Sequence, residues 1–74
     1  MKNHGFDSMV EDSIDTLILL NNLEVRYFND GVFVAVVPSD SISIGCYLSR
    51  IQDRGCLVTF RVIDGVLILV ISRF

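Results

Sequence analysis

Two unbroken apolar runs constrain this chain more than any other feature, and each begins directly after an Asp-Gly pair. The sequence reads YFNDGVFVAVVP from Tyr27 to Pro38 and RVIDGVLILVIS from Arg61 to Ser72. A strand that borders water on one face alternates apolar and polar residues, whereas a strand covered on both faces is continuously apolar. We therefore expect both runs to be strands that are covered on both faces.

Each run ends a helix–strand–turn–strand unit, so the predicted order of elements is αββαββ. The first helix is predicted over residues 9–21, with Ser8 as its N-cap and Glu11 completing an S-x-x-E capping box. The strand that follows alternates, and its predicted inward residues are Leu23, Val25 and Tyr27. The Asp-Gly pair then predicts a tight hairpin turn.

The second helix is predicted from apolar residues in helical phase. They lie at positions i, i+3, i+4 and i+7, namely Ile44, Tyr47, Leu48 and Ile51. We expect this helix to begin between Ser39 and Ser43 and to end before Gly55. Gly45 is costly inside a helix, which indicates either close backbone packing or a helix that starts after it.

The predicted fold class is α+β: a four-stranded antiparallel sheet with the two continuous strands near its centre. The strand over residues 56–63 alternates, with Val58, Phe60 and Val62 inward. Two helices cover one face of this sheet. A length of 74 residues predicts one domain over 1–74, and we expect residues 1–7 to form a flexible N-terminal segment.

The second face of the sheet requires another cover. Hydrophobic residues make up 51% of the sequence, and a chain this short buries only about 60–65% of its unfolded surface. We expect a homodimer in which two sheets meet face to face, with a permanent hetero-partner as the alternative. The predicted interface is Phe33, Ala35, Val37, Leu67, Leu69 and Ile71, or their alternates along the same strands.

Charge and hydropathy argue against two classes of partner. The net charge is −3, and six of the nine acidic residues precede Pro38, which argues against nucleic-acid binding. The longest apolar runs are too short for a transmembrane helix, so we expect no membrane association. The N-terminus lacks the apolar region of a signal peptide, and we expect a cytoplasmic protein with reduced thiols.

No catalytic constellation is evident in the sequence. His4, the single histidine, is interpreted as an exposed terminal residue, and Cys46 and Cys56 as buried, reduced residues. The spacing of the two cysteines does not match a zinc motif, and no phosphate-binding loop or hydrolase motif occurs. We expect no metal, no cofactor and no enzymatic activity.

Two groups of charged residues are candidate contacts. Tyr47, Arg50 and Arg54 follow one side of the second helix, and with Arg61 they would suit an anionic ligand or a nucleic acid. Ordinary surface arginines paired with carboxylates are the simpler interpretation. Glu11, Asp12 and Asp15 near the start of the first helix predict a solvated acidic face, or a docking surface for a basic protein.

The functional hypothesis is a non-enzymatic interaction protein. In size and surface character the chain is similar to small proteins that act by binding a larger one, such as antitoxins, immunity proteins and phage-encoded inhibitors. Together with the homodimer expected from the apolar sheet, that resemblance implies a protein that inhibits or scaffolds another macromolecule, an unidentified protein partner. The alternative is a small module that binds an anionic ligand or nucleic acid through the arginines of the second helix.

Overall fold

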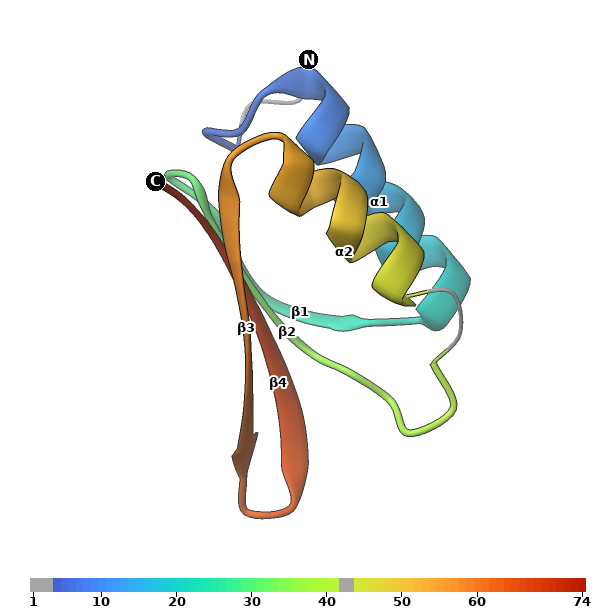
Figure 1. Cartoon of the computed structure of the whole chain (residues 1–74). Coiled ribbons are helices and arrows are strands. Elements are labelled where there is room, and N and C mark those ends of the chain that lie inside the picture. Colours follow the sequence, from blue (N-terminus) through green and yellow to red (C-terminus); the bar gives the residue numbers. More distant parts are fainter. Residues whose placement is uncertain (1–3, 42–43) are drawn as a thin grey trace.

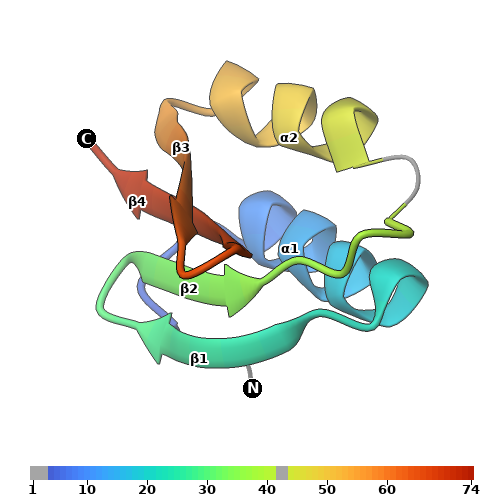
Figure 2. The ribbon, with the colours of Figure 1, turned by 90° about the horizontal axis from the view of Figure 1, so that it is seen from below.

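The computed structural model describes residues 4–41 and 44–74, which form two helices and a four-stranded sheet in the order αββαββ (Figure 1). The strand order in the sheet is β1-β2-β4-β3, and all neighbouring strands are antiparallel. Both helices lie on the same side of the sheet (Figure 2). The predicted α+β fold is therefore confirmed, with the two continuous apolar strands in the central positions.

The first helix, α1 (Ser8–Asn21), has a side-chain cap at its N-terminus and a left-handed residue at its C-terminus. Asp7 is the N-cap, because its carboxylate accepts hydrogen bonds from the backbone N–H groups of Met9 and Val10. The capping box predicted for Ser8 and Glu11 is thus wrong by one residue. Asn22 ends the helix in the left-handed conformation at φ 53°, as the Asn-Asn pair predicts.

The second helix, α2 (Ile44–Asp53), starts at the first residue that the structure describes after residue 41. The predicted starts at residues 42 and 43 lie outside the described residues. Gly45 falls in the first turn, and a Cβ there would meet no atom within 4 Å, so the predicted close packing at Gly45 is wrong. Leu48 and Ile51 are buried, which confirms the helical phase of the apolar stripe.

Two tight hairpins build the sheet. The first joins β1 (Glu24–Asn29) to β2 (Val32–Val36), and the second joins β3 (Cys56–Ile63) to β4 (Val66–Arg73). Each turn is an Asp-Gly pair with positive φ at both residues, which matches the right-handed twist of the strands. The β3–β4 hairpin extends beyond the ends of both helices (Figure 1).

The core lies between the helices and one face of the sheet. Val10, Ile14 and Leu17 from α1 and Ile51 from α2 are almost fully buried. From the sheet, the core includes Phe33 and Ala35 of β2 and Leu69 and Ile71 of β4, none of which exposes any surface. One chain therefore covers most of one face of its central strands, where Leu67 of β4 stays partly accessible.

Residues 4–7 pack against the β1–β2 turn rather than extending away from the domain. The backbone N–H of Gly31 donates a 2.9 Å hydrogen bond to the carbonyl of His4. The imidazole of His4 stacks on Phe28 with ring centroids 3.8 Å apart, and Phe6 is buried in the core. Residues 4–7 therefore contact the domain, the predicted flexibility of the segment stays a prediction, and residues 1–3 lie outside the described part.

Candidate interaction surface

The face of the sheet opposite the helices is apolar and uncovered within a single chain. We call it the open face, and the strand registers order its residues in rows across the sheet. Its centre is formed by Val32, Val34 and Val36 of β2 and Ile68 and Val70 of β4, all partly accessible. On the outer strand β3, Leu57 and Ile63 expose 47% and 54% of their surface. No described segment of the chain covers this face.

The six residues that we predicted for the interface lie on the opposite face. Phe33, Ala35, Val37, Leu69 and Ile71 are buried under the helices, and Leu67 packs partly against the same core. Neighbouring residues of a strand point to opposite faces, so the open face consists of their alternates. The named residues therefore face the helices and their alternates form the open face, while the interface itself stays a prediction.

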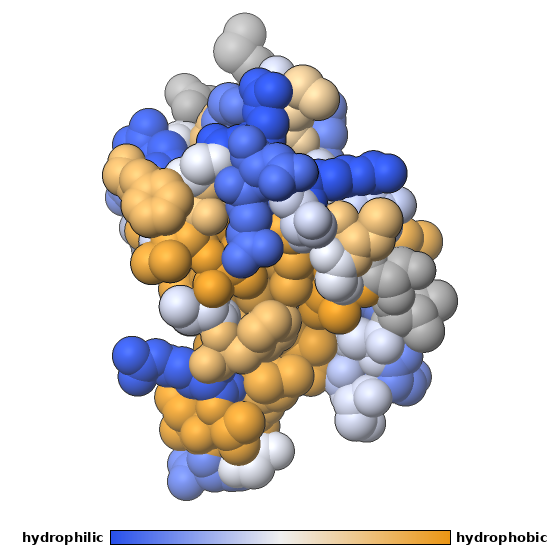
Figure 3. All heavy atoms as spheres, in the orientation of Figure 1, coloured by the Kyte–Doolittle hydropathy of each residue, from blue (hydrophilic) through white to orange (hydrophobic). Residues whose placement is uncertain are grey.

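The far end of the β3–β4 hairpin is apolar on both sides. Phe60 and Val62 share the helix-facing side of the sheet, but the hairpin projects past the helices, so they are 47% and 72% exposed. Val66 is 39% exposed on the open side. Figure 3, in the orientation of Figure 1, shows hydrophobic residues gathered in the middle and lower part of the molecule, where the hairpin lies.

Charged residues flank the open face at its two outer strands. Glu24 on β1 and Arg61 on β3 occupy the same row, because Glu24 pairs with Val36, Val36 with Ile68, and Ile68 with Arg61. The row therefore runs from acidic through two apolar residues to basic. The Glu24 carboxylate also lies 2.7 Å from Arg26 Nη2, in a pair whose side chains are more than 60% exposed.

A β-bulge at Arg26 in the outer strand β1 changes which side chains face the helices from Tyr27 onward. Val25 pairs with Ala35 and Tyr27 with Val34, so the extra residue reverses the alternation between them. Tyr27 consequently lies on the open face, 45% exposed, and donates a hydrogen bond to Asp30 Oδ2. That carboxylate acceptor raises the pKa of Tyr27. The inward position predicted for Tyr27 is wrong.

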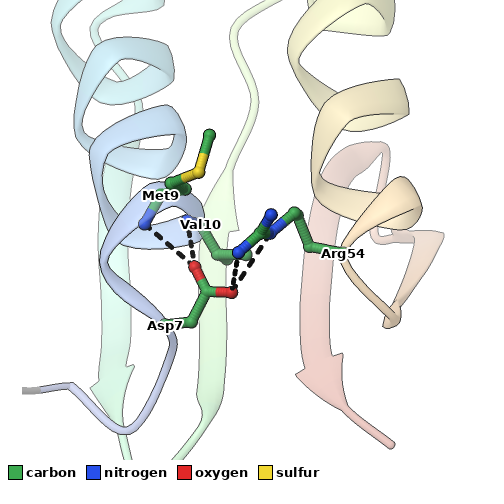
Figure 4. A network of polar contacts seen from close by, with 4 residues as sticks. All are labelled: Asp7, Met9, Val10 and Arg54. Carbon is green, nitrogen blue, oxygen red and sulfur yellow. Dashed lines mark hydrogen bonds and ion pairs between the residues drawn. The ribbon is translucent and has the colours of Figure 1, made fainter.

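Arg54, one of the predicted anion contacts, forms hydrogen bonds with the carboxylate of Asp7 (Figure 4). Arg54 donates from Nε and Nη2 to Asp7 Oδ2 at 3.2 and 2.9 Å, while Asp7 Oδ1 caps α1. The hydrogen bonds from Arg54 and from the capped N–H groups lower the pKa of Asp7 below 3.8. Arg54 therefore joins the ends of the two helices.

Arg50 lies over the ring of Tyr47, with the guanidinium carbon 5.2 Å from the ring centroid. Both residues are on α2, and Arg50 also borders a hollow of about 430 Å³ between the helices. Met9, Asp12, Ser13, Asp53 and Arg54 complete the lining. The hollow thus carries two basic and two acidic side chains, which leaves little net attraction for an anion. Arg61 lies on β3, away from this group.

The predicted acidic face of α1 divides into buried and accessible parts. Glu11 is only 3% exposed, and its Oε2 accepts a 3.0 Å hydrogen bond from the backbone N–H of His4. Its role is therefore to fix the N-terminal segment, and the prediction of a solvated side chain is wrong for Glu11. Asp12 is exposed and Asp15 is half-buried on the same helix.

The three candidate chemical side chains lie apart in the fold. His4 Nδ1 is 2.8 Å from the carbonyl oxygen of Phe28, so the histidine is packed rather than free at the terminus. Cys46 is exposed on α2, against the prediction of a buried residue. Cys56 is buried at the start of β3, and burial raises its pKa. Among residues 4–41 and 44–74, no cluster of three metal-ligating side chains occurs.

Asp7 is the helix cap that the sequence reasoning assigned to Ser8 instead. It directly precedes Ser8, and Asp is as good an N-cap as Ser, so the two positions compete on equal terms in the sequence. The long-range partner Arg54 could not be identified from local spacing, because 47 residues separate the pair.

In the described part of the chain, neither helix has the length and apolar character required to cross a bilayer. Comparisons of the chain with family models, with curated proteins and with solved structures find no match.

Proposed function

We propose that this chain is a non-enzymatic interaction protein that acts as a homodimer, with the open faces of two copies packed together. The observation that carries the proposal is the apolar centre of the open face, which spans both central strands without a charged residue. Exposed apolar surfaces of this size on a small domain are characteristic of association sites.

The dimensions of the open face fit a second copy. Strands lie about 4.8 Å apart and rise about 3.3 Å per residue, so four strands of up to eight residues present roughly 400–500 Å². Two such faces bury roughly 1,000 Å² in total, which is at the lower end of specific interfaces. Interfaces at this limit are weak, so we expect association that is detectable at tens of micromolar protein.

Face-to-face packing leaves the helix layers on the two outer sides of the dimer. The outward part of α1 combines apolar and acidic groups, with Met9 and Leu19 58% and 83% exposed beside Asp12. This surface would remain accessible to a larger macromolecule. Such an arrangement supports an inhibitor or scaffold of the antitoxin or immunity-protein type, in which the dimer presents its helices twice.

The alternative function, a module that binds anions or nucleic acid through α2, has weaker support. Arg54 is engaged by Asp7, and Arg50 lies near Asp12 and Asp53 in the hollow between the helices. Arg61 is on the opposite layer. The arginines therefore do not form one basic patch, which an electrostatic site for phosphate needs.

Light scattering coupled to size-exclusion chromatography tests the proposal at tens of micromolar protein. The unmodified chain should have twice the 8.3 kDa chain mass. Val34→Lys places a charge at the centre of the open face and should give a folded monomer. Val62→Lys is the matched control, because Val62 is 72% exposed on the other side of the sheet, and this variant should remain dimeric.

Two results would remove the proposal. One is a monomeric, folded, unmodified chain at this concentration. The other is a dimer that survives Val34→Lys and dissociates on Val62→Lys, since that outcome would move the interface to the projecting hairpin. Circular dichroism of each variant confirms that the subunit itself has folded.

A further inference from the structure

The distribution of charge on the open face selects one geometry for the dimer. Of the rows that cross all four strands, one carries charge, and it has Glu24 at the β1 end and Arg61 at the β3 end. The other rows carry Tyr27 and Asn29 on β1, and Thr59 and Leu57 on β3. The charged row is therefore asymmetric across the sheet, with Glu24, which contacts Arg26 of the same strand, at the β1 end and Arg61 at the β3 end.

A two-fold axis in the plane of an interface can lie along the strands or across them. An axis along the strands, between β2 and β4, places β1 of one copy over β3 of its partner. Positions in one row then face positions in the same row, so Glu24 lies over Arg61 and Val36 over Ile68. An axis across the strands places β1 over β1 and leaves Glu24 and Arg61 without an opposite charge on the other copy.

We infer that the dimer axis runs along the strands between β2 and β4, so that Glu24 of each copy pairs with Arg61 of the other. This inference rests on the proposed homodimer and specifies its geometry. Aligned sheets pack about 10 Å apart with strand directions about 30° from each other, which the side chains of Glu and Arg can span from the two faces. The symmetry forms this ion pair twice.

The neighbouring rows are compatible with the same axis. Val34 lies over Val70, which places apolar side chains together at the centre, and Tyr27 lies over Thr59. The existing contact between Glu24 and Arg26 does not prevent the new pair, because exposed ion pairs contribute little and a carboxylate can accept from two cations. The charges lie at the rim of the face, where they select orientation more than they add affinity.

Charge reversal provides a sharp test, because the two single variants should be complementary. Glu24→Arg alone sets Arg against Arg at both rim sites, and Arg61→Glu alone sets Glu against Glu. Each homodimer should weaken about tenfold or more in Kd at low salt. An equimolar mixture restores both opposite-charge pairs and should associate within about threefold of the unmodified chain. The double variant Glu24→Arg/Arg61→Glu should also regain its dimer.

Arg26→Ala is the matched control, because it removes the same intrachain contact of Glu24 without changing the charge at either end of the row. It should dimerise like the unmodified chain. Sedimentation velocity in 20 to 50 mM salt measures each species, where screening is weak.

The outcomes separate this inference from the proposed function. Single variants that dimerise normally, or a mixture that associates no better than its components, overturn the axis while the homodimer stands. An unmodified chain that sediments as a monomer overturns the homodimer itself. Weakening by Arg26→Ala equal to that by Glu24→Arg assigns the effect to the intrachain contact and contradicts the pairing with Arg61.

Discussion

The carboxylate of Asp7 contacts the ends of both helices. Its Oδ1 caps α1. Its Oδ2 accepts a 2.9 Å hydrogen bond from Nη2 of Arg54, the residue that follows α2. Asp7→Ala removes the cap and the interhelical contact together, so we expect the melting temperature to fall by several degrees. Ser8→Ala is the control, because Ser8 is the first residue of the helix and not its cap. Thermal unfolding followed by circular dichroism compares the two. Equal losses for both variants would contradict the assignment of Asp7 as the cap.

The same carboxylate predicts a pH dependence of stability. Its pKa is lowered in the folded chain from the ordinary value of 3.8, so the ionised form stabilises the fold above pH 3.8. This contribution is lost as the pH falls through the lowered pKa. Asp7→Asn keeps a good cap but cannot be ionised, so it should be less stable than the unmodified chain at pH 7.

The stability difference between the unmodified chain and Asp7→Asn should shrink below pH 4 and disappear at lower pH. Urea unfolding at several pH values measures this difference. A difference that stays constant from pH 7 to pH 2 would show that ionisation of Asp7 is irrelevant to the fold.

The docking of the N-terminal segment predicts unequal effects at two glycines with nearly the same backbone conformation. Gly5 has φ +86°, and a Cβ there would overlap the backbone nitrogen of Gly31; Gly55 has φ +87° and open space around it. Gly55→Ala should cost about 1–2 kcal/mol from the left-handed conformation alone. Gly5→Ala must also displace the segment from the β1–β2 turn.

Hydrogen exchange at the amide of Gly31 reports the docking directly, because that N–H donates to His4. Exchange should accelerate in Gly5→Ala and stay unchanged in Gly55→Ala. If the amide of Gly31 were equally protected from exchange in both variants, a docked N-terminal segment would be contradicted.

The two cysteines should react at very different rates. Cys46 is exposed, whereas Cys56 is buried and its pKa is raised by burial, which reduces the fraction of reactive thiolate near neutral pH. With a disulfide reagent at pH 7.5, we expect one fast thiol for each folded chain and a second only after unfolding. Cys46→Ser should abolish the fast phase; if Cys56→Ser abolished it instead, the burial assigned to β3 would be incorrect.

The element order and the central position of β2 and β4 could be predicted because local patterns determine them. Asp-Gly pairs specify the turns, and continuous apolar runs favour the central positions of a sheet. The side of each run that faces the helices could not be assigned from the run itself, because both alternating sets are apolar. Register supplies the missing signal: the two-residue turn pairs Val62 with Leu67, and so places Leu67 and Leu69 on the face of the inward residues of β3.

Other errors arise from contacts that no local pattern encodes. The bulge at Arg26 reverses the alternation of β1 and moves Tyr27 to the open face. The buried position of Glu11 depends on the return of residues 4–6 across the β1–β2 turn, which a terminal sequence rich in polar residues does not predict. Tertiary contacts, rather than propensity, determine both.

The most direct test of the central claim is an isotope-filtered NOE experiment on an equal mixture of ¹³C-labelled and unlabelled chains. The account predicts intermolecular NOEs between methyl groups of the open face, above all between Val34 of one copy and Val70 of the other. The claim is contradicted if these methyl groups show no intermolecular NOE at concentrations in the hundreds of micromolar. It is equally contradicted if the NOEs arise from Val62 and Phe60 on the projecting hairpin instead.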